Sequence, residues 1–262
     1  PRIAASGTRV HVVWRDNRNG GADLYVRPSR NSGSSFDTAV RVDTGDLVGS
    51  NASVDPDIAA DGDNAYVVWV DNRDAGSLDI WMNRSIDAGM TWLATPTKLD
   101  QDPFPHDSIA PRVVALSSSR TIVAWVDYRD GFPDILTSRS TNAGMTFSAP
   151  VRLDTGTAAG TSASLTVSLA ASGDLVAAAW SDDRSGFTDV YANFSLDAGA
   201  TWQPQDYRMD TNTIGTTDSQ TPSVAVGSGR VHVVWTDHRR GSGCPVTGTQ
   251  CPNADIYYRR ME

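Results

Sequence analysis

The sequence predicts an all-β repeat protein, and three observations support this fold class. A Trp-x-Asp-x-Arg motif returns every 55 or 56 residues, and so constant a period is typical of repeat architectures. Apart from Glu262 and Lys98, every acidic residue is Asp and every basic residue is Arg. Asp favours turns, whereas Glu and Lys favour helices. No segment shows the apolar period of about 3.6 residues that marks an amphipathic helix.

The five copies of this motif set the register of the repeats. They are Trp14/Asp16/Arg18, Trp69/Asp71/Arg73, Trp125/Asp127/Arg129, Trp180/Asp182/Arg184 and Trp235/Asp237/Arg239. An Asp–Arg pair at a strand end can tie a hairpin or a neighbouring unit through paired hydrogen bonds. A residue that every repeat needs is more often structural than functional. We therefore assign these Asp and Arg residues to the fold.

Each of the first four repeats contains four short strand-like segments. In the second repeat these are Pro56–Ala60, Ala65–Trp69, Asp79–Asn83 and a segment ending in Lys98–Asp100. Four short strands per unit, repeated radially, is the plan of a β-propeller. We expect one domain over residues 1–262 with five four-stranded blades. Their approximate ranges are 1–55, 56–110, 111–164, 165–221 and 222–262.

The last repeat is shorter than the others. After its third strand, at Asp255–Tyr258, four residues remain, from Arg259 to Glu262. Four residues are too few for a turn and a strand of the usual five or six. We therefore expect the fifth blade to lack its outer strand. Its open edge would be completed by residues upstream of Pro1 or by a partner chain.

A second repeated pattern is Ser-x-Asp/Asn-x-Gly-x-Thr/Ser-aromatic. It occurs at Ser29–Phe36, Ser85–Trp92, Ser140–Phe147 and Ser195–Trp202. The Ser and Asp/Asn side chains can bond to backbone groups of a tight turn, and the Gly permits a positive φ. The aromatic residue restarts a strand by packing into the core. The pattern predicts a hairpin connector, in which Asp87 and Asp197 serve the fold.

With these turns the chain resembles the Asp-box (bacterial neuraminidase repeat) family of sialidase-like β-propellers. The resemblance implies that each turn joins the two outer strands of a blade. Enzymes of that family use three arginines to hold a carboxylate, a Tyr nucleophile assisted by a Glu, and an Asp acid/base. Arg2 and Arg112 match the arginines in part, but the sole Glu is Glu262 at the chain end. The resemblance thus covers the whole chain for the fold but not for catalysis.

Residues that differ between repeats at equivalent positions are the better candidates for binding. The second position of the first strand is occupied in turn by Arg2, Asp57, Arg112, Thr166 and Ser223. The turns add aromatic or imidazole groups, which can stack on sugar rings. The predicted ligand-binding residues are Arg2, Asp57, Arg112, Tyr128, Phe132, Phe187 and His238, and no residue is assigned as catalytic.

The sequence shows no motif for a cofactor and no His/Cys metal cluster. Calcium remains an alternative, because Asp-rich turns offer carboxylates and carbonyls. However, the turn from Asp16 to Asp23 places Arg18 inside the would-be site and lacks the spacing of a calcium loop.

Charge and cysteine usage limit the partners and the compartment. A net charge of −9 argues against nucleic acid, whose backbone demands a basic surface, and no apolar run is long enough to span a membrane. Cys244 and Cys251 flank a local insertion, and we expect a short-range disulfide between them and an oxidising compartment. Together with the start at Pro1 without Met, this predicts a secreted, extracellular or periplasmic protein.

The sequence favours a non-catalytic binding or assembly module whose partner is a carbohydrate or a protein. One alternative is a sialidase-type glycoside hydrolase, or a fragment of one. Another is a structural subunit of a larger extracellular complex. The missing Glu argues against the enzyme, and the missing outer strand favours assembly.

Overall fold

The computed structural model describes residues 1–74, 76–238 and 255–261, which form strands, turns and loops with no helix. Sheet 1 consists of β1 (Arg2–Ser6), β2 (Arg9–Asp16), β3 (Asp23–Ser29) and β4 (Val40–Arg41). Sheet 2 consists of β5 (Ser53–Asp61), β6 (Asn64–Asp71), β7 (Asp79–Ser85) and β8 (Thr97–Lys98). Sheet 3 consists of β9 (Ser108–Ser117), β10 (Arg120–Asp127), β11 (Asp134–Ser140) and β12 (Val151–Arg152).

The remaining strands form two further sheets. Sheet 4 consists of β13 (Ser164–Ser172), β14 (Leu175–Asp182), β15 (Asp189–Ser195) and β16 (Tyr207–Arg208). Sheet 5 consists of β17 (Ser219–Gly227), β18 (Arg230–Asp237) and β19 (Asp255–Met261), and among the described residues it has no fourth strand. The prediction of an all-β fold, with four-stranded sheets and a last sheet of three, is confirmed.

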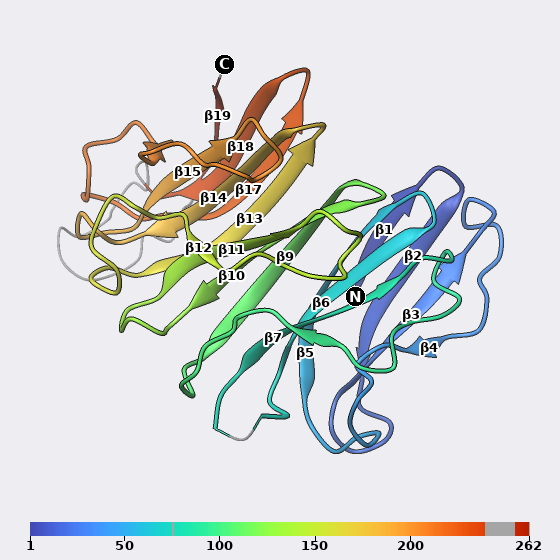
Figure 1. The fold of residues 1–262 in the computed structure, drawn as a ribbon. Helices are drawn as coiled ribbons and strands as arrows, with labels where there is room; N and C mark the ends of the chain where they lie inside the picture. The colour runs from blue at the N-terminus through green and yellow to red at the C-terminus, as the bar shows by residue number, and fades with distance from the viewer. Residues whose placement is uncertain (75, 239–254, 262) are drawn as a thin grey trace. The chain divides into compact units, whose positions relative to one another are not determined.

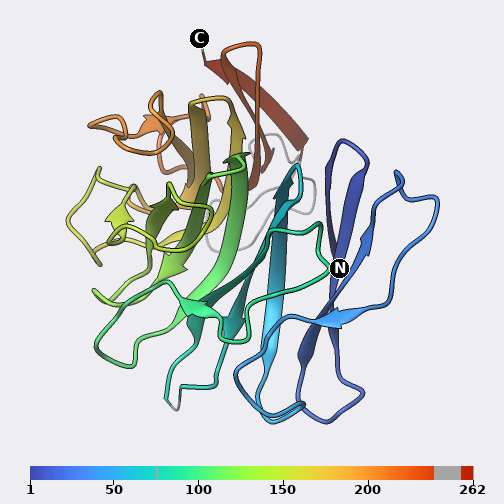
Figure 2. The ribbon, with the colours of Figure 1, turned by 45° about the vertical axis from the view of Figure 1, so that its right-hand side comes forward.

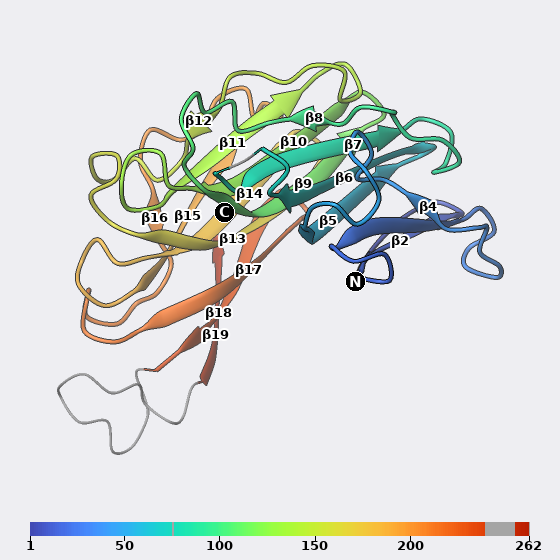
Figure 3. The same cartoon turned by 90° about the horizontal axis from the view of Figure 1, so that it is seen from below.

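Within each sheet the strands follow one another in chain order, as Figure 3 shows for β5 to β8 of sheet 2. The second strand pairs antiparallel with the third, and in sheets 1, 2, 4 and 5 its motif Trp lies opposite the same position. The pairs are Trp14–Tyr25, Trp69–Trp81, Trp180–Tyr191 and Trp235–Tyr257. This shared register makes residues in different repeats directly comparable.

The chain divides into two compact units, and the division runs through sheet 3. Unit 1 comprises Pro1–Arg129 and Leu136–Val151, and unit 2 comprises Asp130–Ile135 and Arg152–Glu262. In unit 1, β1, β5 and β9 lie side by side (Figure 1), and apolar side chains fill the spaces between sheets 1 and 2 and between sheets 2 and 3. In unit 2 a third cluster packs sheet 4 against sheet 5. The single-domain interpretation remains a prediction.

The first strands begin earlier than the sequence indicated. The second repeat was expected to open at Pro56, but β5 begins at Ser53, and β9 and β17 likewise begin at Ser108 and Ser219. The cause is a β-bulge near the start of β5, β9, β13 and β17. Asp55, Ala110, Thr166 and Thr221 occupy this bulge position with φ between +45° and +55°. A residue with a positive φ inside a strand interrupts the alternation of apolar and polar residues by which strands are predicted from a sequence.

Some predictions fall on residues outside the described ranges. These are the disulfide between Cys244 and Cys251 and the role of Arg239. In the part of the chain that the structure describes, no helix has the length and apolar character needed to cross a membrane.

Candidate functional site

In the four repeats whose motif Arg is described, the Trp-x-Asp-x-Arg motif forms one hydrogen-bonded network at the end of the second strand. In sheet 3, Trp125 Nε1 donates to Asp127 Oδ2 at 3.0 Å, and Arg129 donates from its backbone N at 3.0 Å and from its side chain at 2.6 and 2.7 Å. Ser108 of the first strand adds a bond of 3.1 Å. Arg129 Nη2 also donates to the carbonyl of Asp100 in the preceding sheet at 2.7 Å. These contacts join strands and sheets, and they occupy the acceptor atoms of the Asp.

Arg73 does not form the paired side-chain hydrogen bonds that an Asp–Arg pair of this motif can make. Its side chain reaches Asp71 through Nη2 alone, at 2.6 Å, and its buried Nε has no hydrogen-bond partner within the described ranges. The reason is that the guanidinium group lies over the Trp81 ring, 4.5 Å from the centroid, and donates from Nη1 to the Thr44 carbonyl of the preceding repeat at 2.7 Å. The Arg184 side chain likewise contacts the Asp of its motif through Nη2 only, while its backbone N donates to the same carboxylate at 2.8 Å.

Arg73 nevertheless stays with the fold rather than with a binding surface. Its side chain is 8% exposed, whereas the equivalent Arg18 is 62% exposed. A buried guanidinium group that is held by a carboxylate, a carbonyl and an aromatic ring is not available to a ligand. Arg73 and Arg129 thus link their repeats to the preceding ones, whereas the Arg184 side chain donates to Asp182 and Asp206 of its own repeat.

The Ser-x-Asp turn satisfies its own backbone. Asp87 Oδ1 accepts the Thr91 N–H at 2.9 Å, and Asp87 Oδ2 accepts the Thr91 hydroxyl at 2.6 Å. Ser85 Oγ accepts the Gly89 N–H at 2.9 Å. In repeat 3, Asn142 replaces the Asp and still accepts the Thr146 N–H at 2.9 Å. All these partners lie inside the turn.

Carboxylate pairs lie between the third and fourth strands, each beside one cation. Arg152 Nε lies 3.0 Å from Asp134 and 3.0 Å from Asp154, and Arg208 contacts Asp189 at 2.9 Å and Asp210 at 2.7 Å. Burial first, and then the neighbouring carboxyl group, raises the pKa of Asp134 and of Asp210 to about 7. The same causes raise the pKa of Asp100, beside Asp79, to about 6. Because this arrangement recurs in successive repeats, we assign it to the fold.

One charged cluster is not repeated, and it is our candidate site. Unit 1 brings Arg2 of β1, Asp57 of β5 and Arg112 of β9 together on three neighbouring first strands, as the sequence predicted for these positions. Arg2 Nε lies 3.9 Å from Asp57 Oδ1, and Arg112 Nη1 lies 3.7 Å from Asp55 Oδ2. These separations are longer than hydrogen bonds. Arg112 Nη1 donates to the Pro111 carbonyl at 2.7 Å, which leaves the other N–H groups of Arg112, and those of Arg2, to face a ligand.

Asp57 is the most deeply placed of these charged groups. Its side chain is 18% exposed, against 48% for Arg2 and 43% for Asp55. Burial raises the pKa of Asp57, although the Val113 amide, Arg112 and Arg2 offset part of that effect. Burial disfavours the charged form of a carboxyl group. Asp57 is therefore suited to a role in which its carboxyl group carries a proton.

Asp57 also has a structural contact. Val113 N donates to Asp57 Oδ2 at 3.0 Å and ties β9 to β5. In unit 2, Val224 N donates to Ser168 Oγ at 3.0 Å and ties β17 to β13 in the same way. A hydroxyl group is therefore sufficient for the tie. The carboxyl group at position 57 provides an acidic function that the tie does not need.

The pairing register between the first and second strands corrects one of the equivalent positions assigned from the sequence. Arg2, Asp57 and Arg112 pair with Val13, Val68 and Ala124, each one residue before the motif Trp. In sheet 4 the residue at that position is Ser168, opposite Ala179, and not Thr166. Thr166 has a φ of +55° and occupies the bulge, where Asp55 stands in sheet 2. Sequence reasoning missed Asp55 because nothing in the alternation of the strand marks a bulge.

The other predicted binding residues lie on loops that follow second strands. Tyr128 belongs to unit 1, where its backbone N donates to the Asp107 carbonyl at 3.0 Å. Phe132, Phe187 and His238 belong to unit 2. Phe132 and Phe187 are exposed by 60% and 45%, and His238 Nδ1 lies 3.2 Å from the Asp218 carbonyl. The set predicted from the sequence is therefore divided between the two units.

The cluster can do two kinds of chemistry. A protonated Asp57 can donate a proton to a leaving oxygen, and Asp55 can act as the second carboxylate of an acid–base pair. The guanidinium groups of Arg2 and Arg112 can hold an anionic group by paired hydrogen bonds. Within the described ranges, no three His, Cys, Asp or Glu residues are grouped to hold a metal ion.

Comparison with known proteins identifies the fold. No family model and no curated protein matches the sequence. The α-L-arabinanase of Penicillium chrysogenum, solved with arabinobiose, is 12% identical, with a TM-score of 0.58 over 92% of this chain and 78% of the arabinanase. An α-L-arabinofuranosidase of Fusarium graminearum, solved with an iminosugar inhibitor, is 14% identical, with a TM-score of 0.60 over 92% and 74%. A Hadza microbial sialidase is 14% identical, with a TM-score of 0.57, and this chain spans 55% of its length.

These matches show a sialidase-like β-propeller fold, with which five sheets are consistent. They also correct the interpretation of the chain as a non-catalytic binding or assembly module. The arabinanase, the arabinofuranosidase and the sialidase that share the fold are glycoside hydrolases, and the glycosidase alternative accords better with them. The missing Glu bears on one type of glycosidase mechanism only, and other types rely on different residues.

Proposed function

We propose that the chain is the propeller of a secreted glycoside hydrolase whose reaction centre is the cluster of Arg2, Asp55, Asp57 and Arg112. The observation that carries the proposal is the half-buried Asp57 carboxyl group, two residues after a second, more exposed carboxyl group on the same bulged strand. The fold shared with arabinan-degrading enzymes and a sialidase supports it. The four Ser-x-Asp turns support membership of the Asp-box group. Cys244 and Cys251 support an oxidising compartment.

Asp57 acts as the general acid. Its environment favours the protonated form, and a carboxylic acid can protonate the glycosidic oxygen as the bond to the sugar breaks. Asp55 supplies the carboxylate that stabilises the developing positive charge or activates water. This scheme relies on two Asp residues and does not need the Glu-assisted Tyr of sialidases.

The preferred substrate carries an acidic sugar. Arg2 and Arg112 approach the carboxylates from neighbouring strands at 3.9 and 3.7 Å, so their remaining N–H groups can bind a sugar carboxylate. Bidentate binding of a carboxylate is the interaction that a guanidinium group makes best. A neutral arabinofuranoside would leave this capacity unused.

The proposal is tested by the hydrolysis of aryl glycosides by the purified protein. The panel contains a sialoside, a glucuronide and an α-L-arabinofuranoside. We expect turnover of an acidic glycoside, with KM raised at least about tenfold by Arg112→Ala, which corresponds to about 1.4 kcal/mol of lost binding. Turnover of the arabinofuranoside alone would overturn the substrate class. Absence of turnover on the whole panel would overturn the enzymatic proposal.

A further inference from the structure

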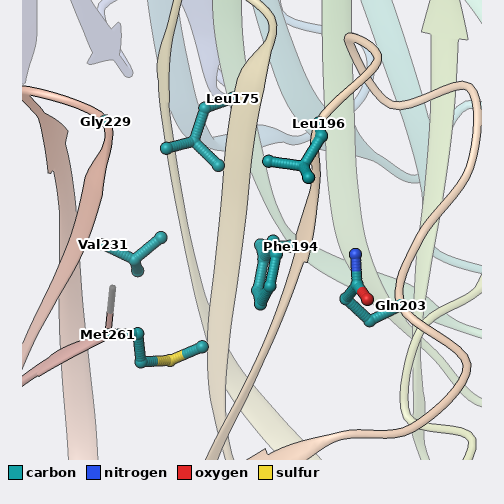
Figure 4. Close-up of a pocket in the computed structure, with 7 residues that line it drawn as sticks. All are labelled: Leu175, Phe194, Leu196, Gln203, Gly229, Val231 and Met261. Carbon is teal, nitrogen blue, oxygen red and sulfur yellow. The ribbon is translucent and has the colours of Figure 1, made fainter.

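Two places in the described chain differ from the equivalent places in other repeats. The first is an apolar groove between sheets 4 and 5 in unit 2, with a volume of about 340 Å³. Figure 4 shows Phe194 at its centre, with Leu196 from sheet 4 and Val231 and Met261 from sheet 5 around it. Met261 belongs to β19, which forms one edge of sheet 5 among the described strands (Figure 2).

The repeats account for this groove without a ligand. Between sheets 1 and 2 the same place is filled by the Ser-x-Asp turn of sheet 2. Gly89 of that turn lies so close to His11 and Pro28 that a Cβ would come within 2.9 to 3.0 Å of them. Pro28 stands directly before the Ser of its own turn, as Phe194 does in sheet 4. The groove thus has the position of a Ser-x-Asp turn, and we assign it to the fold.

The second place is the linker of residues Gln101–Asp107, called linker 2, which leads from β8 to β9 in unit 1. In repeats 1, 3 and 4 the corresponding linker is bonded twice to its own sheet. A linker Gly donates its N–H to the Asp of the third strand at 2.9 to 3.3 Å, in the pairs Gly49–Asp23, Gly160–Asp134 and Gly215–Asp189. The Arg of the fourth strand donates to a linker carbonyl at 3.0 to 3.1 Å, in the pairs Arg41–Asp46, Arg152–Thr157 and Arg208–Asn212.

Within the described residues, linker 2 makes neither bond. It contains no Gly, and the fourth strand carries Lys98, whose Nζ contacts Asp74 at 3.2 Å and Asp79 at 2.9 Å. Asp79 Oδ2 is buried and has no hydrogen-bond partner in the described ranges. An unpaired buried acceptor costs stability. Such a local loss is expected where a segment serves a function instead of the fold.

Linker 2 instead folds into a turn around Asp102, whose side chain is 5% exposed. Asp102 Oδ1 accepts the Phe104 N–H at 2.9 Å, and Asp102 Oδ2 lies 2.9 Å from His106 Nδ1. At the end of linker 2, Asp107 Oδ1 accepts the Leu78 N–H at 2.9 Å. This bond fixes the turn to the loop before β7, so that linker 2 is held at both ends.

His106 presents a hydrogen-bonding atom to solvent. An ionised carboxyl group only accepts hydrogen bonds, so the hydrogen atom between Asp102 and His106 belongs to Nδ1. In the neutral imidazole Nε2 is then an acceptor. The His106 side chain is 41% exposed, and among the described residues none donates to its Nε2.

Phe104 adds an apolar surface beside this imidazole. It is 66% exposed, and its ring centroid lies 6.1 Å from that of His106, with an interplanar angle of 66°. Pro103 and Pro105 flank it and restrict the backbone on both sides, so that little conformational entropy is lost when a ligand covers the ring. An aromatic face with a hydrogen-bonding group at its side suits a sugar ring, which has an apolar C–H face and hydroxyl groups around it.

We propose that linker 2 is a subsite that binds a neutral sugar unit. The Phe104 ring stacks on the C–H face of that unit, and His106 Nε2 accepts a hydrogen bond from one of its hydroxyl groups. The carboxylates of Asp102 and Asp107 disfavour an anionic unit at this place.

This inference rests on the proposed function, because it assigns the neutral unit to the same glycan whose acidic unit binds between Arg2 and Arg112. Linker 2 leads directly into β9, and Arg112 follows His106 by six residues. At the rise of an extended chain their Cα atoms are at most about 20 Å apart, a distance that an oligosaccharide can span.

The inference is tested by isothermal titration calorimetry of the purified chain with neutral hexasaccharides of arabinose, xylose, galactose and glucose. We expect saturable binding of at least one of them. Phe104→Ala should weaken that binding at least about tenfold, since the apolar contact is lost, and His106→Ala should weaken it about threefold or more. Leu47→Ala is the matched control, because Leu47 is an apolar residue of the linker in repeat 1 and is 80% exposed. Its affinity should equal that of the parent.

The assay measures binding and not turnover, so it can fail while the hydrolase proposal stands, and the reverse. The Phe104 and Leu47 side chains are exposed, so these two variants fold as the parent does. On the aryl monosaccharide glycosides named above, Phe104→Ala should leave KM unchanged, because these substrates have no unit that could occupy linker 2.

Three results would contradict the subsite. One is the absence of saturable binding by all four hexasaccharides. Another is an affinity that is equal for the parent, Phe104→Ala and Leu47→Ala, because the sugar would then bind elsewhere. The third is a self-association in sedimentation that Phe104→Ala abolishes, which would assign the exposed ring to a contact between proteins.

Discussion

The Oδ2 atom of Asp57 accepts a hydrogen bond of 3.0 Å from the Val113 amide, and this bond joins the first strands of sheets 2 and 3. The equivalent bond in unit 2, from Val224 to Ser168 Oγ, has the same length. The comparison separates two roles at one position. The hydrogen-bond acceptor is needed for the fold, whereas an acidic group is present in sheet 2 and absent from sheet 4.

The Ser-x-Asp turn gives a stability prediction. Asp87→Ala removes the acceptors of the Thr91 N–H and hydroxyl groups. We expect the free energy of unfolding to fall by about 1–2 kcal/mol, the scale of a lost capping bond. Asp87→Asn should cost about 0.5 kcal/mol or less, since Asn142 makes the same backbone bond in repeat 3. Urea denaturation measures both, and equal losses for Ala and Asn would contradict this account.

Loss of the Asp in the Trp-x-Asp-x-Arg network should lower the free energy of unfolding more than the loss of Asp87 in the Ser-x-Asp turn. Asp127→Ala leaves the Trp125 indole N–H, the Ser108 hydroxyl and the Arg129 guanidinium without their buried acceptor. Removing one partner of a buried charged pair costs about 3–5 kcal/mol. Asp130→Ala, three residues away on the exposed turn, is the control and should change stability by less than about 0.5 kcal/mol. A loss at Asp127 no larger than at Asp130 would show that the network is dispensable.

The buried carboxyl pairs predict that stability depends on pH. The pKa of Asp210, with Asp189 beside it, is raised to about 7 from an ordinary value of 3.8. Between these values the folded state binds more protons than the unfolded state. The stabilisation is therefore complete below pH 3.8 and is lost as pH rises through about 7. Asp134 contributes in the same direction.

The measurement compares the parent with Asp210→Asn from pH 4 to pH 8. We expect the parent to lose on the order of 2 kcal/mol more than the variant over this range. The difference between the two proteins is needed because burial lowers the pKa of His11, which opposes the trend by destabilising the fold below pH 6.5. Parallel pH profiles for the two proteins would contradict the assignment.

The sequence predicted those parts of the structure that depend on regular patterns. The period of the Trp residues located five sheets, and the same period placed Arg2, Asp57 and Arg112 on neighbouring first strands. The bulge could not be predicted, because its four positions hold three residue types, Asp55, Ala110, Thr166 and Thr221, which adopt a positive φ under tertiary constraint. As a result Asp55 was missed, and Thr166 was aligned where Ser168 stands.

Contacts between sheets were also beyond prediction. The single side-chain bond from Arg73 to Asp71 follows from the position of Trp81 and of the Thr44 carbonyl, which the motif itself does not contain. The groove beside Phe194 exists only through the packing of two sheets. A repeated motif therefore predicts where a side chain stands but not every partner that it contacts.

The central claim is that Asp57 carries the acid function of a glycoside hydrolase, and one pair of variants tests it most directly. Asp57→Ser keeps a hydroxyl acceptor for the Val113 amide, as Ser168 does for Val224, and removes the acid. Ser168→Ala is the matched control, since it removes the equivalent tie without touching the cluster. On the aryl glycoside turned over by the parent, we predict that Asp57→Ser lowers kcat by about 100-fold or more with an unchanged melting temperature, and that Ser168→Ala leaves kcat unchanged. Full turnover by a folded Asp57→Ser variant would contradict the account.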